Sequence, residues 1–194
     1  MRRKTFDALL ATGGLVLAVV LLVAGSLLIW GSSFATGQVR QQLSAQQIFF
    51  PAAGTKALAD PQVGPYLNRY AGQQLTTGEQ AKAYADHFIA VHLKEMTGGQ
   101  TYAQLSSKAL ANPTDQQLQG QVATVFRGET LRGLLLNAYA FGTLGRIAGI
   151  AAITSFTGAA LMLTLSGLGL LHLRRVPGDA WLVVPGRHAA PVTA

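Results

Sequence analysis

The sequence contains no cysteine, which excludes disulfide bonds, thiolate metal sites and cysteine nucleophiles. Charged side chains are also scarce: they make up 12% of the 194 residues, about half the share that is usual in soluble domains. The scarcity is uneven, because two long stretches hold almost no charge and the segment between them holds most of it. With 49% hydrophobic residues, this distribution is typical of a membrane protein.

Motifs of several enzyme and transporter classes are absent as well. The chain has no G-x-S-x-G turn and no Ser followed three residues later by Lys, so it lacks two common signatures of serine nucleophiles. Its glycine pairs match no phosphate-binding loop. The two apolar stretches contain no Asp, Glu, Lys or Arg that would mark a proton or ion path. These absences argue against a hydrolase, a nucleotide-binding protein and a transporter core.

Two apolar stretches are long enough to cross a bilayer as helices. Ala8–Trp30 has 23 residues without charge, and Ile147–Leu173 has 27. At about 1.5 Å per residue they reach roughly 35 and 40 Å, against a hydrocarbon core of roughly 30 Å. A cleaved signal peptide is the alternative for the first stretch, since Ser33-Phe34-Ala35 resembles a small-x-small cleavage site. Signal peptides usually have a shorter apolar core, so the length favours an uncleaved anchor.

The net charge of +7 is concentrated at the two membrane ends of the chain. The basic residues that flank the apolar stretches are Arg2, Arg3 and Lys4 before the first and Arg174 and Arg175 after the second. Because an excess of Lys and Arg marks the cytoplasmic side, we expect a plasma-membrane protein with both termini in the cytoplasm. No basic stripe with interleaved aromatic residues remains, so no nucleic-acid partner is expected.

The expected fold class is an all-α membrane protein with two transmembrane helices that enclose a small extracytoplasmic helical bundle. Period-two runs of β-branched residues are missing between the apolar stretches, which argues against a sheet. The expected segments are a cytoplasmic head (1–7), a first span (8–30), an extracytoplasmic domain (31–146), a second span (147–173) and a disordered cytoplasmic tail (174–194).

Local patterns predict the helices of the extracytoplasmic domain. They are Gly37–Gln47, which continues the first span and has Val39 and Leu43 as its apolar points, then Pro65–Gly72, Gly78–Met96, Thr101–Ala111 and one that begins at Pro113 with Asn112 as its cap. Residues 131–145 are too few to cross a membrane, and we expect them as a separate helix on the domain or at the interface. A continuous helix from Gly128 to Leu173 is the alternative.

The helix Gly78–Met96 carries the clearest signals. Thr77 and Gln80 have the capping-box spacing. At 100° per residue, one face is predicted to bury Ala81, Tyr84, Ala85, Phe88 and His92.

The histidines and carboxylates of the helix Gly78–Met96 are candidate metal ligands, but their spacing does not suit a metal site. His92 and Glu95 can share a helix face, but His87 and His92 diverge by about 140° and cannot bind one ion together. We therefore expect no metal and no other cofactor, with His92 at the edge of the core and His87 in solvent. Salt bridges such as Lys82–Asp86 and Glu129–Arg132 account for the carboxylates.

Two features predict contacts with a partner. Small residues recur four apart in the second span, at Gly145 and Gly149 and around Ser155, and such rows let helices approach closely in lipid. They fit either packing of the two spans on each other or contact with a partner protein or a second copy. In Phe126–Gly145, the charged residues Arg127, Glu129 and Arg132 lie beside apolar positions, which suits a partner site or an ordinary juxtamembrane helix. The candidate partner-binding residues are Arg127, Glu129, Arg132, Gly145, Gly149 and Ser155.

The segments Tyr70–Leu93 and Phe126–Ala148, together with the two flanking spans, resemble uncharacterised two-pass membrane proteins of high-GC Gram-positive bacteria. The resemblance implies no activity for any residue. The leading hypothesis is a non-enzymatic membrane protein whose outer domain binds a partner protein or lipid, as an accessory or scaffolding subunit. The alternatives are a ligand sensor without an output domain of its own and a cell-envelope enzyme that uses scattered residues such as His92 and Glu95.

Overall fold

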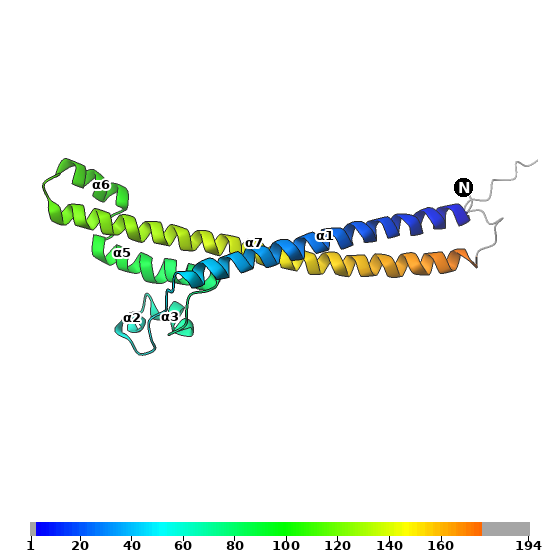
Figure 1. The fold of residues 1–194 in the computed structure, drawn as a ribbon, viewed down its shortest axis with the longest axis horizontal. Coiled ribbons are helices and arrows are strands. Elements are labelled where there is room, and N and C mark those ends of the chain that lie inside the picture. Colours follow the sequence, from blue (N-terminus) through cyan, green and yellow to red (C-terminus); the bar gives the residue numbers. More distant parts are fainter. Residues whose placement is uncertain (1–2, 176–194) are drawn as a thin grey trace, which may run out of the picture. The chain divides into compact units, whose positions relative to one another are not determined.

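The computed structural model describes residues 3–175, and within them the all-α class is confirmed. The only strand-like pairing in that range is an isolated bridge between Phe49 and Gln74. The helices are α1 (Arg3–Ala45), α2 (Lys56–Ala59), α3 (Gly64–Leu67), the 3₁₀ turn η1 (Asn68–Tyr70), α4 (Gly78–Tyr84), the π-helical turn η2 (Ala85–Ile89), α5 (Ala90–Thr97), α6 (Tyr102–Ala111) and α7 (Gln116–Leu173) (Figure 1). Both α1 and α7 are long and apolar enough to cross a membrane, which is typical of a membrane protein. The predicted tail beyond Arg175 lies outside the described residues.

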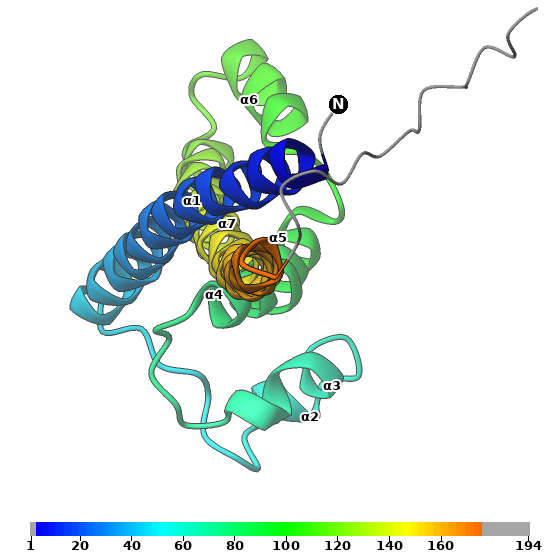
Figure 2. The same ribbon diagram turned by 90° about the vertical axis from the view of Figure 1, so that its right-hand side faces the viewer.

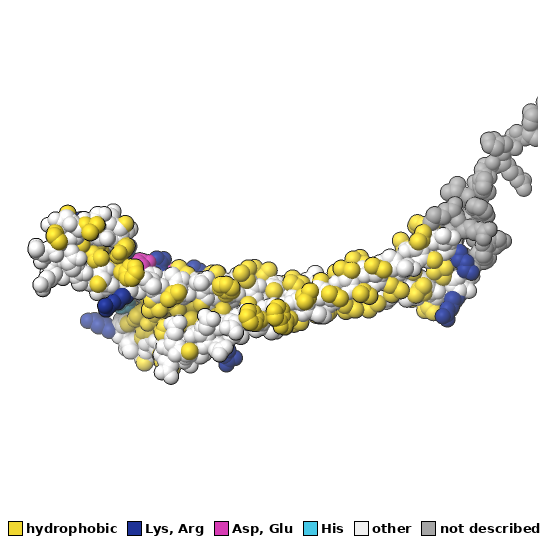
Figure 3. All heavy atoms as spheres, turned by 45° about the horizontal axis from the view of Figure 1, so that its top comes forward, with side chains coloured by type: hydrophobic (Ala, Val, Ile, Leu, Met, Phe, Trp, Pro, Cys, Tyr) yellow, Lys and Arg dark blue, Asp and Glu magenta, His cyan; other side chains and the backbone are white. Residues whose placement is uncertain are grey.

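The chain divides into two compact units, and unit 1 consists of residues 1–29 and 150–194. Its described part contains the beginning of α1 and the end of α7, which pair in antiparallel orientation. The close pairs are Ala11 with Gly169, Gly14 with Ser166, Leu21 with Gly158 and Gly25 with Phe156. Leucine and valine side chains cover most of the outward surface, and basic side chains lie at the helix ends (Figure 3). This surface suits contact with lipid.

Unit 2 spans Trp30–Gly149 and has its own hydrophobic core. The core forms where the end of α1, the α4–η2–α5 helix and the beginning of α7 meet the loop that carries α2 and α3. Its largest fully buried side chains are Leu67, Leu75, Leu135, Val63 and Val125. In Figure 2, α4 and α5 lie next to α7, whereas α6 lies on one side of them and α2 and α3 lie on the other.

Several sequence predictions for unit 2 are confirmed. The helix of the first apolar stretch continues to Ala45 as part of α1, and the apolar points Val39 and Leu43 are buried. Thr77 and Gln80 form the capping box at the start of α4, because each side chain accepts a hydrogen bond from the backbone N–H of the other. Thr101 caps α6 in the same way.

The predicted face of Gly78–Met96 is confirmed for Ala81, Tyr84, Ala85 and Phe88, which are buried or packed against the core, and is wrong for His92. The π-helical turn η2 interrupts the α-helical phase, since Ala90 N–H bonds to Ala85 five residues back. Ile89 and Leu93 are therefore buried, and His92 faces solvent.

The predicted break before the second span is also wrong. Residues 131–145 belong to α7, a continuous helix of 58 residues. The alternative of a continuous helix from Gly128 to Leu173 is therefore correct, and the observed helix begins even earlier in the chain. Neither does a helix begin at Pro113: Asp115 caps α7, because its Oδ1 accepts a 3.0 Å hydrogen bond from the N–H of Leu118. Asn112 instead belongs to the C-terminal end of α6, where its Nδ2 donates to the Lys108 carbonyl at 3.0 Å.

Candidate partner-binding site

The structure places the predicted glycines Gly145 and Gly149 against α1 of the same chain. A β-carbon on Gly145 would lie 3.0 Å from Thr36 Cγ2 and 3.2 Å from Ala35 Cβ. On Gly149 it would lie 3.0 Å from Ser32 Oγ. These two glycines therefore serve packing within the chain, which is one of the two interpretations of their spacing.

Ser155 lies in unit 1 and is partly buried. Its neighbours Ala152 and Ala159, three and four residues away on α7, are fully buried. Ser155 thus belongs to the edge of the small-residue row that lines the helix pair. Its role toward a partner remains a prediction.

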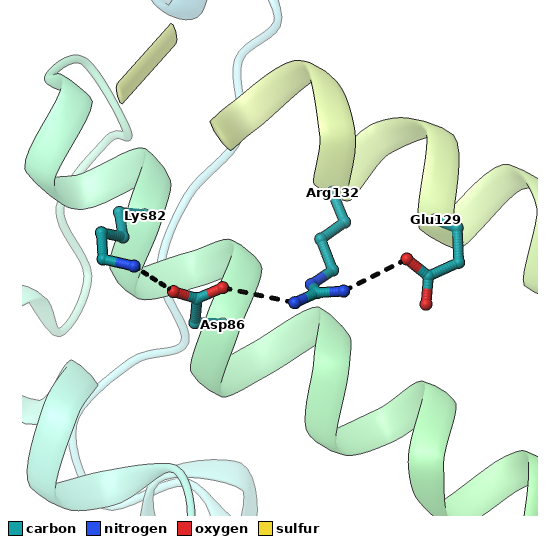
Figure 4. A network of polar contacts seen from close by, with 4 residues as sticks. All are labelled: Lys82, Asp86, Glu129 and Arg132. Atoms are coloured by element: carbon teal, nitrogen blue, oxygen red, sulfur yellow. Dashed lines mark hydrogen bonds and ion pairs between the residues drawn. The ribbon is translucent and has the colours of Figure 1, made fainter. Parts of the chain in front are cut away.

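Glu129 and Arg132 belong to an ion network that joins α7 to the α4–η2 helix (Figure 4). Lys82 Nζ lies 2.5 Å from Asp86 Oδ2, Arg132 Nη2 lies 3.6 Å from Asp86 Oδ1, and Arg132 Nη1 lies 3.3 Å from Glu129 Oε2. The network orients Arg132 toward the α4–η2 helix of its own chain. Arg127, five residues before Arg132, is exposed, and so is Glu129.

The network shifts the pKa of both of its α4–η2 members. Burial alone would raise the pKa of Asp86, but the hydrogen bond from Lys82 and the charges of Lys82 and Arg132 together hold that pKa below its usual value. The same hydrogen bond raises the pKa of Lys82. Lys82 and Asp86 lie on one helix, so the pair that joins this helix to α7 is Asp86 with Arg132.

The α1–α7 pair of unit 2 has two sides, and α4 closes one of them. Gly78 begins α4 so close to α7 that a β-carbon on it would lie 3.1 Å from the Cα of Tyr139. Glu79, the next residue, forms an ion pair with Arg146 of α7. A glycine at position 78 suits this approach, because a β-carbon there would press on the α7 backbone and push the two helices apart by a few tenths of an ångström.

The other side of the pair is an open groove of about 420 Å³, which we name the amide groove. Its floor is formed by the buried residues Val39, Leu43 and Leu135, and its walls by the exposed residues Phe34, Leu134 and Phe141. The polar lining consists of the amide side chains Gln38, Gln42, Gln46 and Asn137. With two alanines these complete the lining, so no charged side chain lines the groove.

The walls of the amide groove are large apolar side chains that remain exposed in unit 2. Phe34 is 57% exposed, Leu134 58% and Phe141 54%. Trp30 is 68% exposed and stacks on Phe34 with ring centroids 5.8 Å apart. A contiguous apolar surface rimmed by polar groups marks a binding site.

The half of this surface that lies on α7 could be predicted from the sequence. Leu134 and Phe141 belong to the apolar positions expected within Phe126–Gly145, although the structure buries Leu135 and leaves Leu134 and Phe141 exposed. The α1 half was missed. The signal was present in Gln38, Gln42 and Gln46, which recur every four residues and thus share one helix face.

The histidines lie apart from the groove. Among residues 3–175, no three His, Cys, Asp or Glu side chains lie close enough to hold a metal ion. The ring of His87 stacks on Tyr66 with centroids 3.5 Å apart, whereas His92 is exposed with Nδ1 2.7 Å from the Phe88 carbonyl oxygen. The prediction for the two histidines is therefore reversed, because η2 turns His92 outward.

No family model, no curated protein and no solved structure matches the chain. Function is therefore inferred from the amide groove and the two apolar helices.

Proposed function

We propose that this protein is a non-enzymatic membrane protein whose unit 2 binds another protein through the amide groove, as an accessory or scaffolding subunit. The observation that carries the proposal is the groove itself, which offers apolar surface and neutral amides but no charged lining residue. Such a surface suits recognition and holds no acid, base or metal ligand for chemistry. The groove lies between two helices, so a third helix is the natural shape to fill it.

The chemistry of the groove lining favours a polypeptide over a phospholipid as its occupant. Glutamine and asparagine side chains both donate and accept hydrogen bonds, and the polar groups of a polypeptide do the same. A phospholipid presents a phosphate, for which Lys or Arg side chains are the usual ligands. The groove lining supplies four amides and no cation.

The proposal includes the membrane topology. We place both termini in the cytoplasm and residues 31–146 outside, in the plasma membrane, because the basic residues flank the two apolar stretches on their outer chain ends. Retention of the first span is supported by packing. Cleavage after Ala35 would remove Ser32 and Ala35, which pack against Gly149 and Gly145.

A matched pair of phenylalanines on α7 tests the proposal. Phe141 lines the groove and is 54% exposed, whereas Phe126 lies on the same helix away from it and is 55% exposed. We expect a tagged chain extracted in mild detergent to retain a stoichiometric companion in wild type and in Phe126→Ser. Phe141→Ser should lose it. Identical companions in all three proteins would contradict the proposal.

A ligand sensor is the second candidate, and the volume of the groove favours it. About 420 Å³ lies within the range of small-molecule sites, roughly 300–1,000 Å³. Thermal unfolding of the full chain in detergent, with and without extract-derived small molecules, would separate the two candidates. A shift that Phe141→Ser abolishes would favour the sensor, and no shift across the library would count against it.

A further inference from the structure

We infer that the occupant of the amide groove is the same groove of a second copy of this chain, so that two α1–α7 pairs form a four-helix bundle about a two-fold axis. The inference rests on the proposed function and names the partner. In such an isologous interface each residue near the axis meets its own copy.

The charge of the groove supports self-pairing. A charged residue near a two-fold axis would face a like charge, and like charges that lie directly opposite each other are destabilising. The lining of the amide groove has no charged residue, although unit 2 carries charges elsewhere on both helices, such as Arg40 and Arg127. An amide, in contrast, can donate to its own copy and accept from it. A surface built from apolar and amide side chains is therefore complementary to itself.

The extent of the groove supports a helical partner that leaves the membrane. Its open apolar surface begins at Trp30, where the first apolar stretch ends, and continues along α1 through Phe34. On α7 it includes Phe141, six residues before the second stretch begins at Ile147. A partner that contacts this surface along its whole length has to leave the bilayer at the same level as α1 and α7. A second copy supplies two helices that do so.

The area is adequate for a dimer. The four large side chains Trp30, Phe34, Leu134 and Phe141 are 54–68% exposed. At about 200 Å² of accessible surface each, they leave roughly 500 Å² of apolar surface uncovered. The neighbouring glutamines raise this toward the about 800 Å² per partner that a standard interface buries.

Because the chain contains no cysteine, single introduced cysteines report the contact without background. The experiment uses the full chain in its native membrane, with Gln38→Cys, Gln42→Cys or Gln46→Cys in the groove, and Gln41→Cys as the matched control. Gln41 is also exposed on α1, but it does not line the groove. After mild oxidation, we expect a covalent dimer at one or more groove positions, in at least tenfold excess over Gln41→Cys. Co-expression of two differently tagged chains should yield the mixed dimer.

The outcomes separate this inference from the proposed function. A groove cysteine that reacts only with a different polypeptide, identified by mass spectrometry, overturns the second copy and leaves the protein-binding function standing. No adduct from any groove position, combined with the mass of a single chain in native mass spectrometry, overturns both. An equal yield of dimer from Gln41→Cys marks random collision and also overturns the inference.

Discussion

Ser166 of α7 places its hydroxyl where a side chain on Gly14 of α1 would begin. Ser166 is buried, and a side chain at position 14 would have to displace its hydroxyl or separate the two helices. The pair Gly14–Ser166 therefore fixes how closely the two helices of unit 1 approach each other. Small residues allow helices to approach this closely in lipid, where close packing rather than hydrophobic burial holds helices together.

Substitution of Gly14 by Leu should destabilise the helix pair by about 1–3 kcal/mol, the usual cost of overpacking. Gly13→Leu is the matched control, because a β-carbon on Gly13 meets nothing within 4 Å. Thermal unfolding of the detergent-solubilised chain would measure both variants. A Gly13→Leu protein that melts as early as Gly14→Leu would show that helix contact is not the cause.

The pair Ser32 and Gly149 should accept an engineered disulfide. A β-carbon on Gly149 would lie 3.8 Å from Ser32 Cβ, which is the mean separation in disulfides. We expect Ser32→Cys with Gly149→Cys to form an intramolecular bond on oxidation, seen as faster migration in a non-reducing gel.

The control for this disulfide is Ser33→Cys with Gly149→Cys, since Ser33 is the exposed neighbour of Ser32. We expect no intramolecular disulfide in this control variant. Failure of the Ser32 pair itself would contradict the antiparallel register in unit 2.

Gln80 should contribute more to stability than its counterpart Gln104. Gln80 is 7% exposed, and its Oε1 accepts from the N–H groups of Thr76 at 2.8 Å and Thr77 at 3.0 Å. Gln80→Leu leaves these partly buried donors unpaired, at a cost of about 2 kcal/mol. At the size of this chain the melting temperature should fall by roughly 4–8 °C.

Gln104→Leu provides the comparison, because Gln104 makes the same capping-box contact with Thr101 N–H at 2.9 Å in an exposed position. Water can replace that contact, so the loss should stay below about 1 kcal/mol. Equal losses at the two sites would contradict the importance of burial.

The ion network should make stability depend on acid pH. The folded-state pKa of Asp86 is lowered from its ordinary value of 3.8, so its contribution is present above pH 3.8 and is lost as the pH falls through the lower folded pKa. Asp86→Asn should flatten this acid decline in the melting temperature. Glu95→Gln, which changes an exposed carboxylate, should leave the decline intact.

At alkaline pH two groups act together. The folded-state pKa of Lys82 is raised, mainly by its hydrogen bond to Asp86, and burial raises that of Tyr84. For both groups, stability is fully present below the ordinary pKa, 10.5 for Lys82 and 10.0 for Tyr84, and is lost as the pH rises through the raised folded pKa. Asp86→Asn should therefore shrink the alkaline decline without abolishing it. A decline unchanged by Asp86→Asn would contradict the role of Lys82.

Sequence reasoning recovered the features of the fold that depend on local chemistry. Length and composition identified the two apolar helices, and the capping-box spacing of Thr77 and Gln80 marked the start of α4. It failed where the deciding interaction is distant in sequence. The π-helical turn at Ala85–Ile89 has no residue signature of its own, and it reversed the positions of His87 and His92.

The amide groove shows the same limit more sharply. Each helix presents its apolar and amide residues on one face, but which part of that face is covered depends on where α4 crosses. That crossing is set by Gly78, which lies more than sixty residues from Gly142 in the chain and within van der Waals distance of it in space. A single sequence gives no measure of such a contact. Leu134 and Leu135 could therefore not be told apart in advance.

The antiparallel pairing of unit 1 has a consequence for biosynthesis. In the proposed membrane topology, α1 enters the membrane long before its partner is made, because residues 30–149 separate the two halves of the pair. At roughly 5–20 residues per second, the wait is on the order of ten seconds. During that time the face with Ala11, Gly14 and Ala18 meets only lipid or other proteins of the insertion machinery. The nascent chain is thus most open to mispairing early in synthesis, and the arrival of Ser166 and Gly169 ends that period.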